Sequence, residues 1–209
     1  MEYIDAVYFI NLDHRKDRFE EIQQEINQMG FPPEKVFRID AIFKQNKGAL
    51  GCTLSHKKTL DTFLESGFKT CLILEDDFLK TIDTNQMKFL FKHLFETVKD
   101  FDLVMLAGKI FKKEITDSPF FHHVLDGQTS SAYLVTREFA PKLRQNFQES
   151  SDLLYEWFEH NNNPNHDYCL DIYWKKLQPQ SKWYIVHPLM GMQRPSFSDI
   201  EQRVTNYGV

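Results

Sequence analysis

The sequence predicts an α/β fold in which a mostly parallel, Rossmann-like sheet is flanked by helices. Three observations lead to this prediction. Apolar runs of strand length alternate with segments of helical periodicity. Glycines follow the helical segments where a helix would end. The longest apolar runs are strand-sized, too short to span a membrane. Alternation of strands and helices is typical of a parallel sheet, because parallel strands need long crossover connections.

The first half of the chain contains most of the regular pattern. Residues 7–10 are an unbroken apolar run, which predicts a buried strand. Phe19, Ile22 and Ile26 recur at helical spacing, and Gly30 follows them, which predicts a helix over residues 16–29. By the same reasoning we expect strands at 36–39, 71–74 and 103–106, and helices at 52–64, ended by Gly67, and at 87–98.

The second half is less regular. We expect a strand at 132–135, a helix at 138–147 and a last strand at 183–186. After a polar break rich in asparagine, a helix over 166–177 is predicted, with Leu170, Trp174 and Leu177 as its buried stripe. The stretch from residue 188 onward has little periodicity and is expected to be a loop or tail.

Composition narrows the class of protein. The chain has 209 residues, 42% hydrophobic and 26% charged, which are ordinary values for a globular domain. Its net charge of −5 argues against a general nucleic-acid binder. Cys52, Cys71 and Cys169 are odd in number and far apart, so we interpret them as buried thiols in a reducing compartment. With an acidic N-terminus unlike a secretory signal, a cytoplasmic location is expected.

Three consecutive acids end one of the predicted strands. The apolar run 71–74 leads directly into Glu75, Asp76 and Asp77. Adjacent carboxylates repel one another unless a cation neutralises them, and hard oxygen donors suit magnesium or manganese. Glu75 and Asp77 alternate onto the same side of the chain. Ligands of open α/β sheets bind at the carboxyl ends of strands, so a metal site is predicted here. The alternative is a solvated turn that caps the next helix.

Five segments stand out along the chain: NLDHRKDR at 11–18, GALGCTLSH at 48–56, LILEDD at 72–77, SSAYLVTR at 130–137 and PLMGMQ at 188–193. Together they resemble glycosyltransferase family twenty-five. That family includes bacterial lipooligosaccharide galactosyltransferases and collagen galactosyltransferases, with relatives in large viruses. The likeness covers nearly the whole chain, and the first three segments in this order are more specific than any one alone.

The resemblance implies a GT-A type fold and an enzyme of glycan biosynthesis. It implies a hexosyltransferase that moves galactose or glucose from a UDP-sugar to an acceptor hydroxyl, using Mn²⁺ or Mg²⁺ and inverting the anomeric carbon. The acceptor would be a glycan, a lipid-linked sugar or a protein hydroxyl. We expect a single domain over 1–209, with a donor half at about 1–110 and an acceptor half at about 111–209, in a bacterial cytoplasm or, if viral, in a host cell.

Several polar residues are expected to bind the donor. Asn11 and Asp13 follow the first strand, where the fold would receive uracil and ribose; Asp13 could instead cap a helix. Arg15 and Arg18 are one turn apart and are expected to face the diphosphate, although Arg15 could equally be a surface charge. Asp40 ends the second strand and is expected to contact the ribose.

The resemblance extends this site. It adds Ser55, Asp76 and Gln193 to the donor-binding residues, although Ser55 and His56 could instead be hydrogen-bonded structural residues on a helix face. It implies Glu75 and Asp77 as metal ligands. His187 is the candidate third ligand, standing where the family usually has an apolar residue or proline.

Asp167 is the candidate general base. In an unbroken helix it would lie roughly 60° from Leu170, beside Trp174, at the edge of the buried face. The alternative is that it favours the helix N-terminus electrostatically. Two other functions stay open: a nucleotidyltransferase using the same acidic cluster, and an inactive module that binds a sugar nucleotide.

Overall fold

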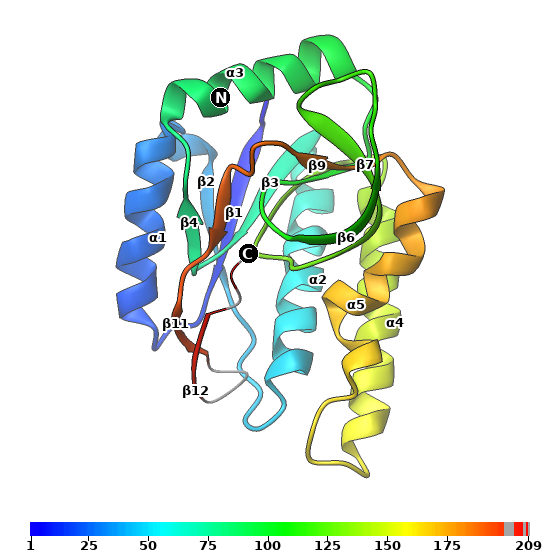
Figure 1. The fold of residues 1–209 in the computed structure, drawn as a ribbon. Helices are drawn as coiled ribbons and strands as arrows, with labels where there is room; N and C mark the ends of the chain where they lie inside the picture. The colour runs from blue at the N-terminus through cyan, green and yellow to red at the C-terminus, as the bar shows by residue number, and fades with distance from the viewer. Residues whose placement is uncertain (199–202, 207, 209) are drawn as a thin grey trace.

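A sheet of eight strands runs through the part of the chain that the computed structural model describes, residues 1–198, 203–206 and 208 (Figure 1). The strands occur in the order β2, β1, β3, β8, β5, β9, β7, β6. Their bounds are Val36–Asp40, Ala6–Asn11, Thr70–Glu75, Ala132–Thr136, Leu103–Met105, Trp183–Val186, Phe121–Gln128 and Lys109–Glu114.

Most of these strands run in one direction. The pairs β1–β2, β1–β3 and β5–β9 are parallel. The pairs β3–β8, β5–β8, β7–β9 and β6–β7 are antiparallel, so only β8 and β7 oppose the other six strands. β8 lies between two strands of the main direction, and its Tyr133 is level with Ile73 on one side and Met105 on the other. The expected α/β class is confirmed.

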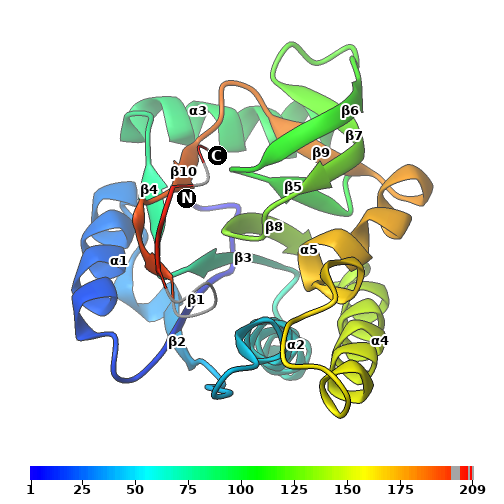
Figure 2. The same ribbon diagram turned by 60° about the horizontal axis from the view of Figure 1, so that its bottom comes forward.

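Helices cover both faces of the sheet, as Figure 2 shows. Along β1, Val7 and Phe9 face one core and Tyr8 and Ile10 the other, because side chains alternate across a strand. The first core is covered by α1 (Lys16–Met29), α3 (Thr84–His93) and the π-helical turn η2 (Leu94–Val98). The second is covered by α2 (Gly48–Ser66), α4 (Ala140–Phe158), α5 (Leu170–Tyr173) and the 3₁₀ segment η4 (Trp174–Gln180).

The helix boundaries follow the local chemistry of the sequence. α1 ends at Gly30 and α2 at Gly67, with left-handed φ values of 77° and 81° that glycine adopts without a Cβ penalty. α3 begins where the Asp83 carboxylate accepts hydrogen bonds from the backbone N–H groups of Asn85 and Gln86. Two short 3₁₀ segments, η1 (Pro33–Lys35) and η3 (His166–Tyr168), connect larger elements.

Several expectations about the elements were wrong. The stretch from residue 188, expected to be a loop, contains β10 (Gly191–Gln193), which pairs with β4 (Phe78–Lys80), and β11 (Ser196–Ser198), which pairs with β12 (Arg203–Thr205). The β6–β7 hairpin was missed because β6 is mostly exposed and rich in lysine, so it shows no apolar pattern. α4 extends eleven residues beyond the expected end at 147, to Phe158.

The helix predicted over 166–177 is broken. Cys169 has an extended backbone (φ −63°, ψ 142°) between η3 and α5. The stripe of Leu170, Trp174 and Leu177 is buried as predicted. Asp167 lies before the break, so its predicted angular position relative to Leu170 was wrong.

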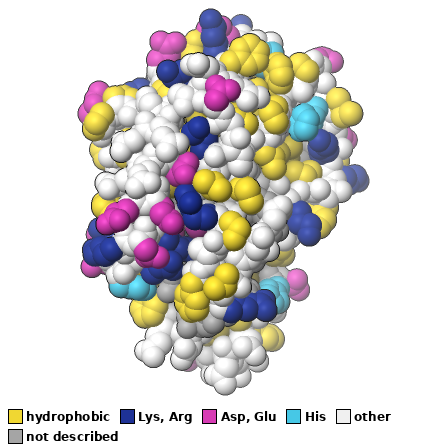
Figure 3. Space-filling model, turned by 60° about the vertical axis from the view of Figure 1, so that its left-hand side comes forward, with side chains coloured by type: hydrophobic (Ala, Val, Ile, Leu, Met, Phe, Trp, Pro, Cys, Tyr) yellow, Lys and Arg dark blue, Asp and Glu magenta, His cyan; other side chains and the backbone are white. Residues whose placement is uncertain are grey.

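The surface on the side of α1 carries both signs of charge, interspersed in Figure 3. Arg194, for example, pairs with Glu21 and Glu25 of α1. Among the described residues, no helix is long and apolar enough to cross a membrane.

Candidate functional site

A pocket of about 520 Å³ opens at the carboxyl ends of β1 and β3. These ends point to the lower side of the view in Figure 1, which Figure 2 turns forward. The loop after β2, the first turns of α2 and the C-terminal strands complete its wall. The lining residues are Ile10, Leu12, Arg18, Ala41, Ile42, Phe43, Lys44, Gln45, Asn46, Gly48, Cys52, Ser55, His56, Glu75, Asp76, Asp77, Gln193 and Ser198.

Glu75, the last residue of β3, is held by two side chains. Its Oε1 accepts a hydrogen bond of 2.6 Å from Ser130 Oγ and lies 3.2 Å from His56 Nε2. The other ring nitrogen of His56, Nδ1, is 2.9 Å from Tyr133 Oη. Burial acts to raise the pKa of Glu75, but the hydrogen bonds from His56 and Ser130 outweigh it and the pKa is lower than usual. Glu75 is therefore an oriented, ionised carboxylate.

Asp76 is turned away from Glu75 toward α1. Its Oδ2 accepts a 2.7 Å hydrogen bond from Asn11 Nδ2, and its Oδ1 lies 2.9 Å from Arg18 Nη1. Burial raises the pKa of Asp76, while Arg18 and Asn11 act in the opposite direction. Both carboxylate oxygens have partners within the protein.

Asp77 has a buried carboxylate oxygen that accepts no hydrogen bond within the described residues. Oδ2 lies 3.0 Å from Arg18 Nη1 and accepts a 3.1 Å hydrogen bond from Gln193 Nε2. Oδ1 is buried and, within the described residues, accepts no hydrogen bond. Burial and then the negative charge of Glu75 raise the pKa of Asp77 to about 7, against the effect of Arg18. A buried oxygen in this state is ready to accept either a proton or a cation.

The charge balance of the cluster favours a cation. Arg18 pairs with Asp76 and Asp77 of the three carboxylates. Its guanidinium also donates to Ser196 Oγ at 2.6 Å and to the Phe197 carbonyl at 2.9 Å. Hard carboxylate oxygens with an unpartnered Oδ1 at the pocket wall fit Mg²⁺ or Mn²⁺, ions that also bind phosphate oxygens. Asp77 and Glu75 could hold such an ion.

A second group of possible ligands shares Glu75. Cys52 and His56 are one turn apart on α2, and a sulfur, a ring nitrogen and a carboxylate oxygen from Cys52, His56 and Glu75 lie within 4.8 Å of one another. Cys52 is half-buried. Burial raises the pKa of its thiol well above the usual range, and the negative charge of Glu75 raises that pKa further.

The loop after β2 is fastened to α2 at two points. A Cβ on Gly51 would lie 2.5 Å from the Ile42 carbonyl, so only glycine permits this approach. Ser55 Oγ accepts a 2.8 Å hydrogen bond from the Ile42 N–H and donates one of 2.7 Å to the Gly51 carbonyl. The loop holds Phe43 at the pocket with 56% of its surface exposed, against the edge of His14 at 5.5 Å between ring centroids.

Asp171, in α5, is a further carboxylate near this site; it is half-buried and is not among the pocket-lining residues. Its Oδ2 accepts a 3.0 Å hydrogen bond from the Thr129 N–H. Burial is the main cause that raises the pKa of Asp171, and the charge of Glu75 raises it further. Asp171 therefore lies within electrostatic range of Glu75.

The structure brings together six of the residues predicted for the site. Lining the pocket are Arg18, Ser55, Glu75, Asp76, Asp77 and Gln193.

Four others at the β1 and β2 ends do not line it. Asn11 is buried behind Asp76 and positions it. Asp13 is exposed and pairs with Lys16, Asp40 is exposed and pairs with Arg38, and Arg15 bonds to Asp17 and the Phe197 carbonyl.

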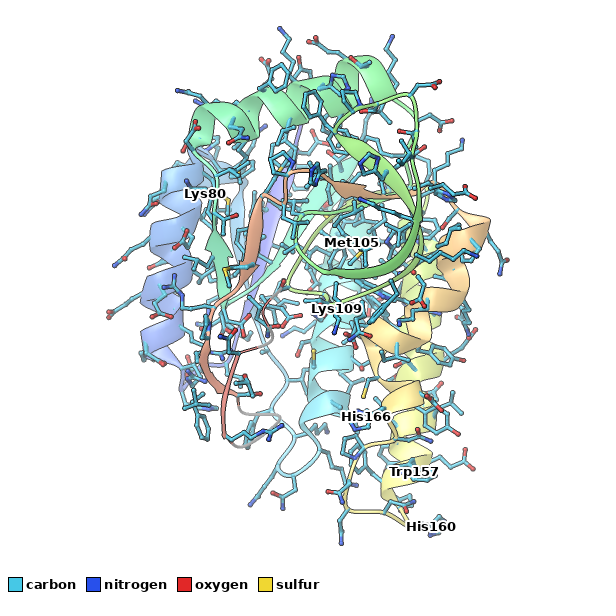
Figure 4. The ribbon with its side chains drawn as sticks, viewed as in Figure 1. Lys80, Met105, Lys109, Trp157, His160 and His166 are labelled. Atoms are coloured by element: carbon cyan, nitrogen blue, oxygen red, sulfur yellow. The ribbon has the colours of Figure 1, made fainter. Side chains whose placement is uncertain are left out.

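Asp167 and His187 lie apart from the pocket. Asp167 is exposed, and its N–H donates to Asn165 Oδ1. Figure 4 places its neighbour His166 near Trp157, toward the C-terminal end of α4. His187 is exposed after β9, with its ring 6.0 Å from that of His122. Neither Asp167 nor His187 is among the pocket-lining residues.

Other residues of the site were not predicted for it. Ser130 and Tyr133 reach Glu75 and His56 because β8 pairs antiparallel with β3, which the apolar pattern does not reveal. Phe43 belongs to a loop without periodicity. The four-residue spacing of Cys52 and His56 was the one available signal for their shared ligand geometry.

No protein-family model and no curated protein matches the sequence. Among solved structures, the chain is similar to A197 from STIV, with 13% identity, a TM-score of 0.46 and coverage of 87% of this chain and 81% of that one. It is similar to a protein described as a mannose-1-phosphate geranyltransferase from Thermus thermophilus, with 11% identity, a TM-score of 0.49 and coverage of 90% of this chain and 73% of that one. It is also similar to the glycosyltransferase GlyE of Streptococcus pneumoniae, with 12% identity, a TM-score of 0.49 and coverage of 88% of this chain and 45% of that one. Each of these likenesses is one of structure and shows no activity for this chain.

Proposed function

We propose that this chain is a metal-dependent glycosyltransferase of GT-A type that transfers a hexose from a UDP-sugar to an acceptor hydroxyl with inversion. One observation carries the proposal: Asp77, with a buried oxygen that lacks a partner, stands beside the ionised Glu75 at the wall of a pocket of about 520 Å³. A pocket of this size is in the range of small-molecule sites. The motif resemblance to family twenty-five supports galactose or glucose as the sugar.

Asp77 and Glu75 would hold Mn²⁺ or Mg²⁺. When bound, the ion would neutralise the charge that develops on the leaving diphosphate. Arg18 adds a fixed positive charge to the same wall, because its contacts to Asp76, Ser196 and the Phe197 carbonyl hold the guanidinium in place. Gln193 orients Asp77 through its hydrogen bond to Oδ2.

The nucleoside is assigned to the loop side of the pocket. Phe43 offers an exposed aromatic face on which a base can stack. Lys44, Gln45 and Asn46 line the same wall and supply polar groups for the edges of uracil and ribose. Gly48 begins α2 at the pocket, and the unpaired backbone N–H groups of a helix N-terminus attract phosphate.

Asp171, in place of Asp167, is our candidate for the general base. It is fixed by the Thr129 N–H, and its raised pKa makes it a better proton acceptor than an ordinary aspartate. Direct displacement by the acceptor oxygen would invert the anomeric carbon. Asp171 would take the proton of the glycan, lipid-linked or protein hydroxyl.

The test is to incubate the metal-free protein with a panel of nucleotide sugars, with and without Mn²⁺ and without an acceptor, and to measure release of the nucleoside diphosphate. We expect slow, manganese-dependent hydrolysis of a UDP-hexose that is lost in Asp77→Asn. Release of diphosphate from a nucleoside triphosphate, with no sugar-nucleotide hydrolysis, would instead indicate a nucleotidyltransferase. Binding of the donor without hydrolysis or transfer would indicate an inactive module.

A further inference from the structure

Cys52 and His56 offer ligand chemistry that the proposed donor site does not use, and both lie close to Glu75, which that site does use. The sulfur and nitrogen come from one face of α2, four residues apart, and the oxygen comes from the end of β3. All three residues line the pocket, so an ion can reach them from solvent. Within the described residues, no other group of three or more His, Cys, Asp or Glu side chains is close enough to hold a metal.

The separations suit a small tetrahedral ion. Around zinc, with bonds of about 2.0–2.3 Å, neighbouring ligand atoms lie about 3.5 Å apart. His56 Nε2 and Glu75 Oε1 are already 3.2 Å apart, and one ligand atom from each of the three residues lies within 4.8 Å of the other two. Bringing all three ligand atoms to the separations found around zinc therefore takes shifts of about 1 Å, which side-chain rotation can supply.

The surrounding hydrogen bonds also match a metal site. A histidine ligand ordinarily donates its second ring N–H to a fixed partner, which sets the tautomer. His56 Nδ1 lies 2.9 Å from Tyr133 Oη. In the metal-free protein Nε2 donates to Glu75; when an ion binds, the ring proton can stand on Nδ1, where the Tyr133 hydroxyl accepts it, and the Nε2 lone pair is free for the ion. Ser130 Oγ fixes the Glu75 carboxylate in the same way.

We propose that Cys52, His56 and Glu75 form a second cation site, selective for a thiophilic divalent ion of the zinc class, with the fourth position open to the pocket. A thiolate and an imidazole favour Zn²⁺ over Mg²⁺ and Mn²⁺, which prefer oxygen donors. The site is thus distinguished from Asp77, which offers oxygen ligands alone.

Binding has a defined proton balance. Forming the zinc–sulfur bond releases the thiol proton of Cys52 to solvent, so one proton leaves for each Zn²⁺ bound. Glu75 is shared with the donor site, and Zn²⁺ should therefore oppose manganese-dependent turnover. Only this last consequence rests on the proposed function.

The experiment uses the metal-free full chain without any nucleotide. Zn²⁺ binding is measured by competition with a chromophoric chelator, and Co²⁺ is used as a spectroscopic probe. We expect one Zn²⁺ per chain and a thiolate-to-cobalt charge-transfer absorption in the wild type. Cys52→Ser should lose that absorption and bind Zn²⁺ at least about tenfold more weakly.

Cys169→Ser is the matched control, because Cys169 is the other half-buried cysteine and belongs to no metal-binding group among the described residues. It should keep both the absorption and the zinc affinity. If Cys52→Ser does not fold, the wild type still decides: bound Zn²⁺ should slow alkylation of Cys52, located by peptide mass spectrometry. A cobalt complex without thiolate absorption, or equal zinc affinity in wild type and Cys52→Ser, would overturn the site. Neither result depends on glycosyl transfer.

Discussion

One nitrogen of Arg18 joins two neighbouring carboxylates: Nη1 lies 2.9 Å from Asp76 Oδ1 and 3.0 Å from Asp77 Oδ2. The guanidinium thereby neutralises about one of the three charges in the cluster and leaves Asp77 Oδ1 without a partner among the described residues. This incomplete neutralisation is the source of the first two predictions.

Asp77→Asn should abolish metal-dependent turnover without unfolding the chain. The amide keeps the side-chain shape but removes the charge that would hold the ion. A metal contributes several kcal/mol to transition-state stabilisation, so turnover should fall by at least about a hundredfold. The measurement is UDP release with saturating donor and Mn²⁺. Asp13→Asn, at an exposed position outside the pocket, is the control and should be unaffected. Wild-type turnover by Asp77→Asn would rule out Asp77 as a metal ligand.

Asp77 should also make stability and metal affinity depend on pH. Burial and Glu75 raise its pKa from 3.8 to about 7, so between these values the native state keeps a proton that the unfolded state releases. The free energy of unfolding contributed by Asp77 therefore falls as pH rises through this window and is constant above it. Urea unfolding at about pH 5 and about pH 8 should show Asp77→Asn gaining stability relative to wild type at the higher pH.

The same proton must leave before a metal binds. The affinity for Mn²⁺ with UDP should rise up to about tenfold per pH unit below pH 7 and level off above it. A flat pH profile for both stability and affinity would contradict the raised pKa.

Asp171→Asn should slow sugar transfer at least about a hundredfold while leaving UDP and Mn²⁺ affinity unchanged, because a general base acts only on the acceptor. Asp167→Asn is the matched control, four residues earlier in the chain, and should transfer sugar at the wild-type rate. Single-turnover assays with acceptor and isothermal titration of UDP separate the two effects. The assignment would have to be exchanged if Asp167→Asn were the impaired variant.

Phe43→Leu should weaken UDP binding by about tenfold, because a stacked base contributes about 1–3 kcal/mol. Binding of inorganic diphosphate with Mn²⁺ should not change, since that ligand has no base. Phe89→Leu removes a similarly exposed ring (53% against 56%) that does not line the pocket, and it should change neither affinity. Equal losses of affinity for UDP and for diphosphate would show that the uracil base does not stack on Phe43.

Gly191→Ala should lower both stability and donor affinity. A Cβ there would lie 2.2 Å from the Phe78 ring and 2.7 Å from the Leu79 carbonyl, so β10 must shift, at a cost of about 1–3 kcal/mol. The shift moves Gln193, which orients Asp77. Gly67→Ala is the comparison: its left-handed φ of 81° costs stability, but no atom lies within 4 Å of the new Cβ, and donor affinity should remain. Unchanged UDP affinity in Gly191→Ala would show that β10 does not position the site.

The sequence predicts the sheet and the acidic centre because both are local signals. The buried strand before Glu75 and the helix ended by Gly30 are visible in short windows of residues. β10 was missed because its strand character arises only from pairing with β4, more than a hundred residues earlier. Long-range pairing of this kind leaves little periodicity in a three-residue strand.

The difference between local and long-range signals also explains why the sequence indicated Asp167, and not Asp171, as the general base. Asp167 was selected by projecting one continuous helix, and a single extended residue, Cys169, removed the basis of that projection. Asp171 could not be preferred from sequence, because its hydrogen bond to the Thr129 N–H, in the loop that follows β7, joins residues far apart in the chain. Ser55 lies at the pocket wall, and both its hydrogen bonds are made within the protein.

The pairing of β10 with β4 also sets the order in which the site can form during synthesis. The eight strands of the central sheet are all translated before residue 187, whereas Gln193 and Ser196, which reach Asp77 and Arg18, emerge from the ribosome later. A nascent chain can therefore assemble its sheet while the acidic cluster still lacks one wall. Competence to bind a donor would then appear only once β10 has paired with β4, as a step separate from folding of the central sheet.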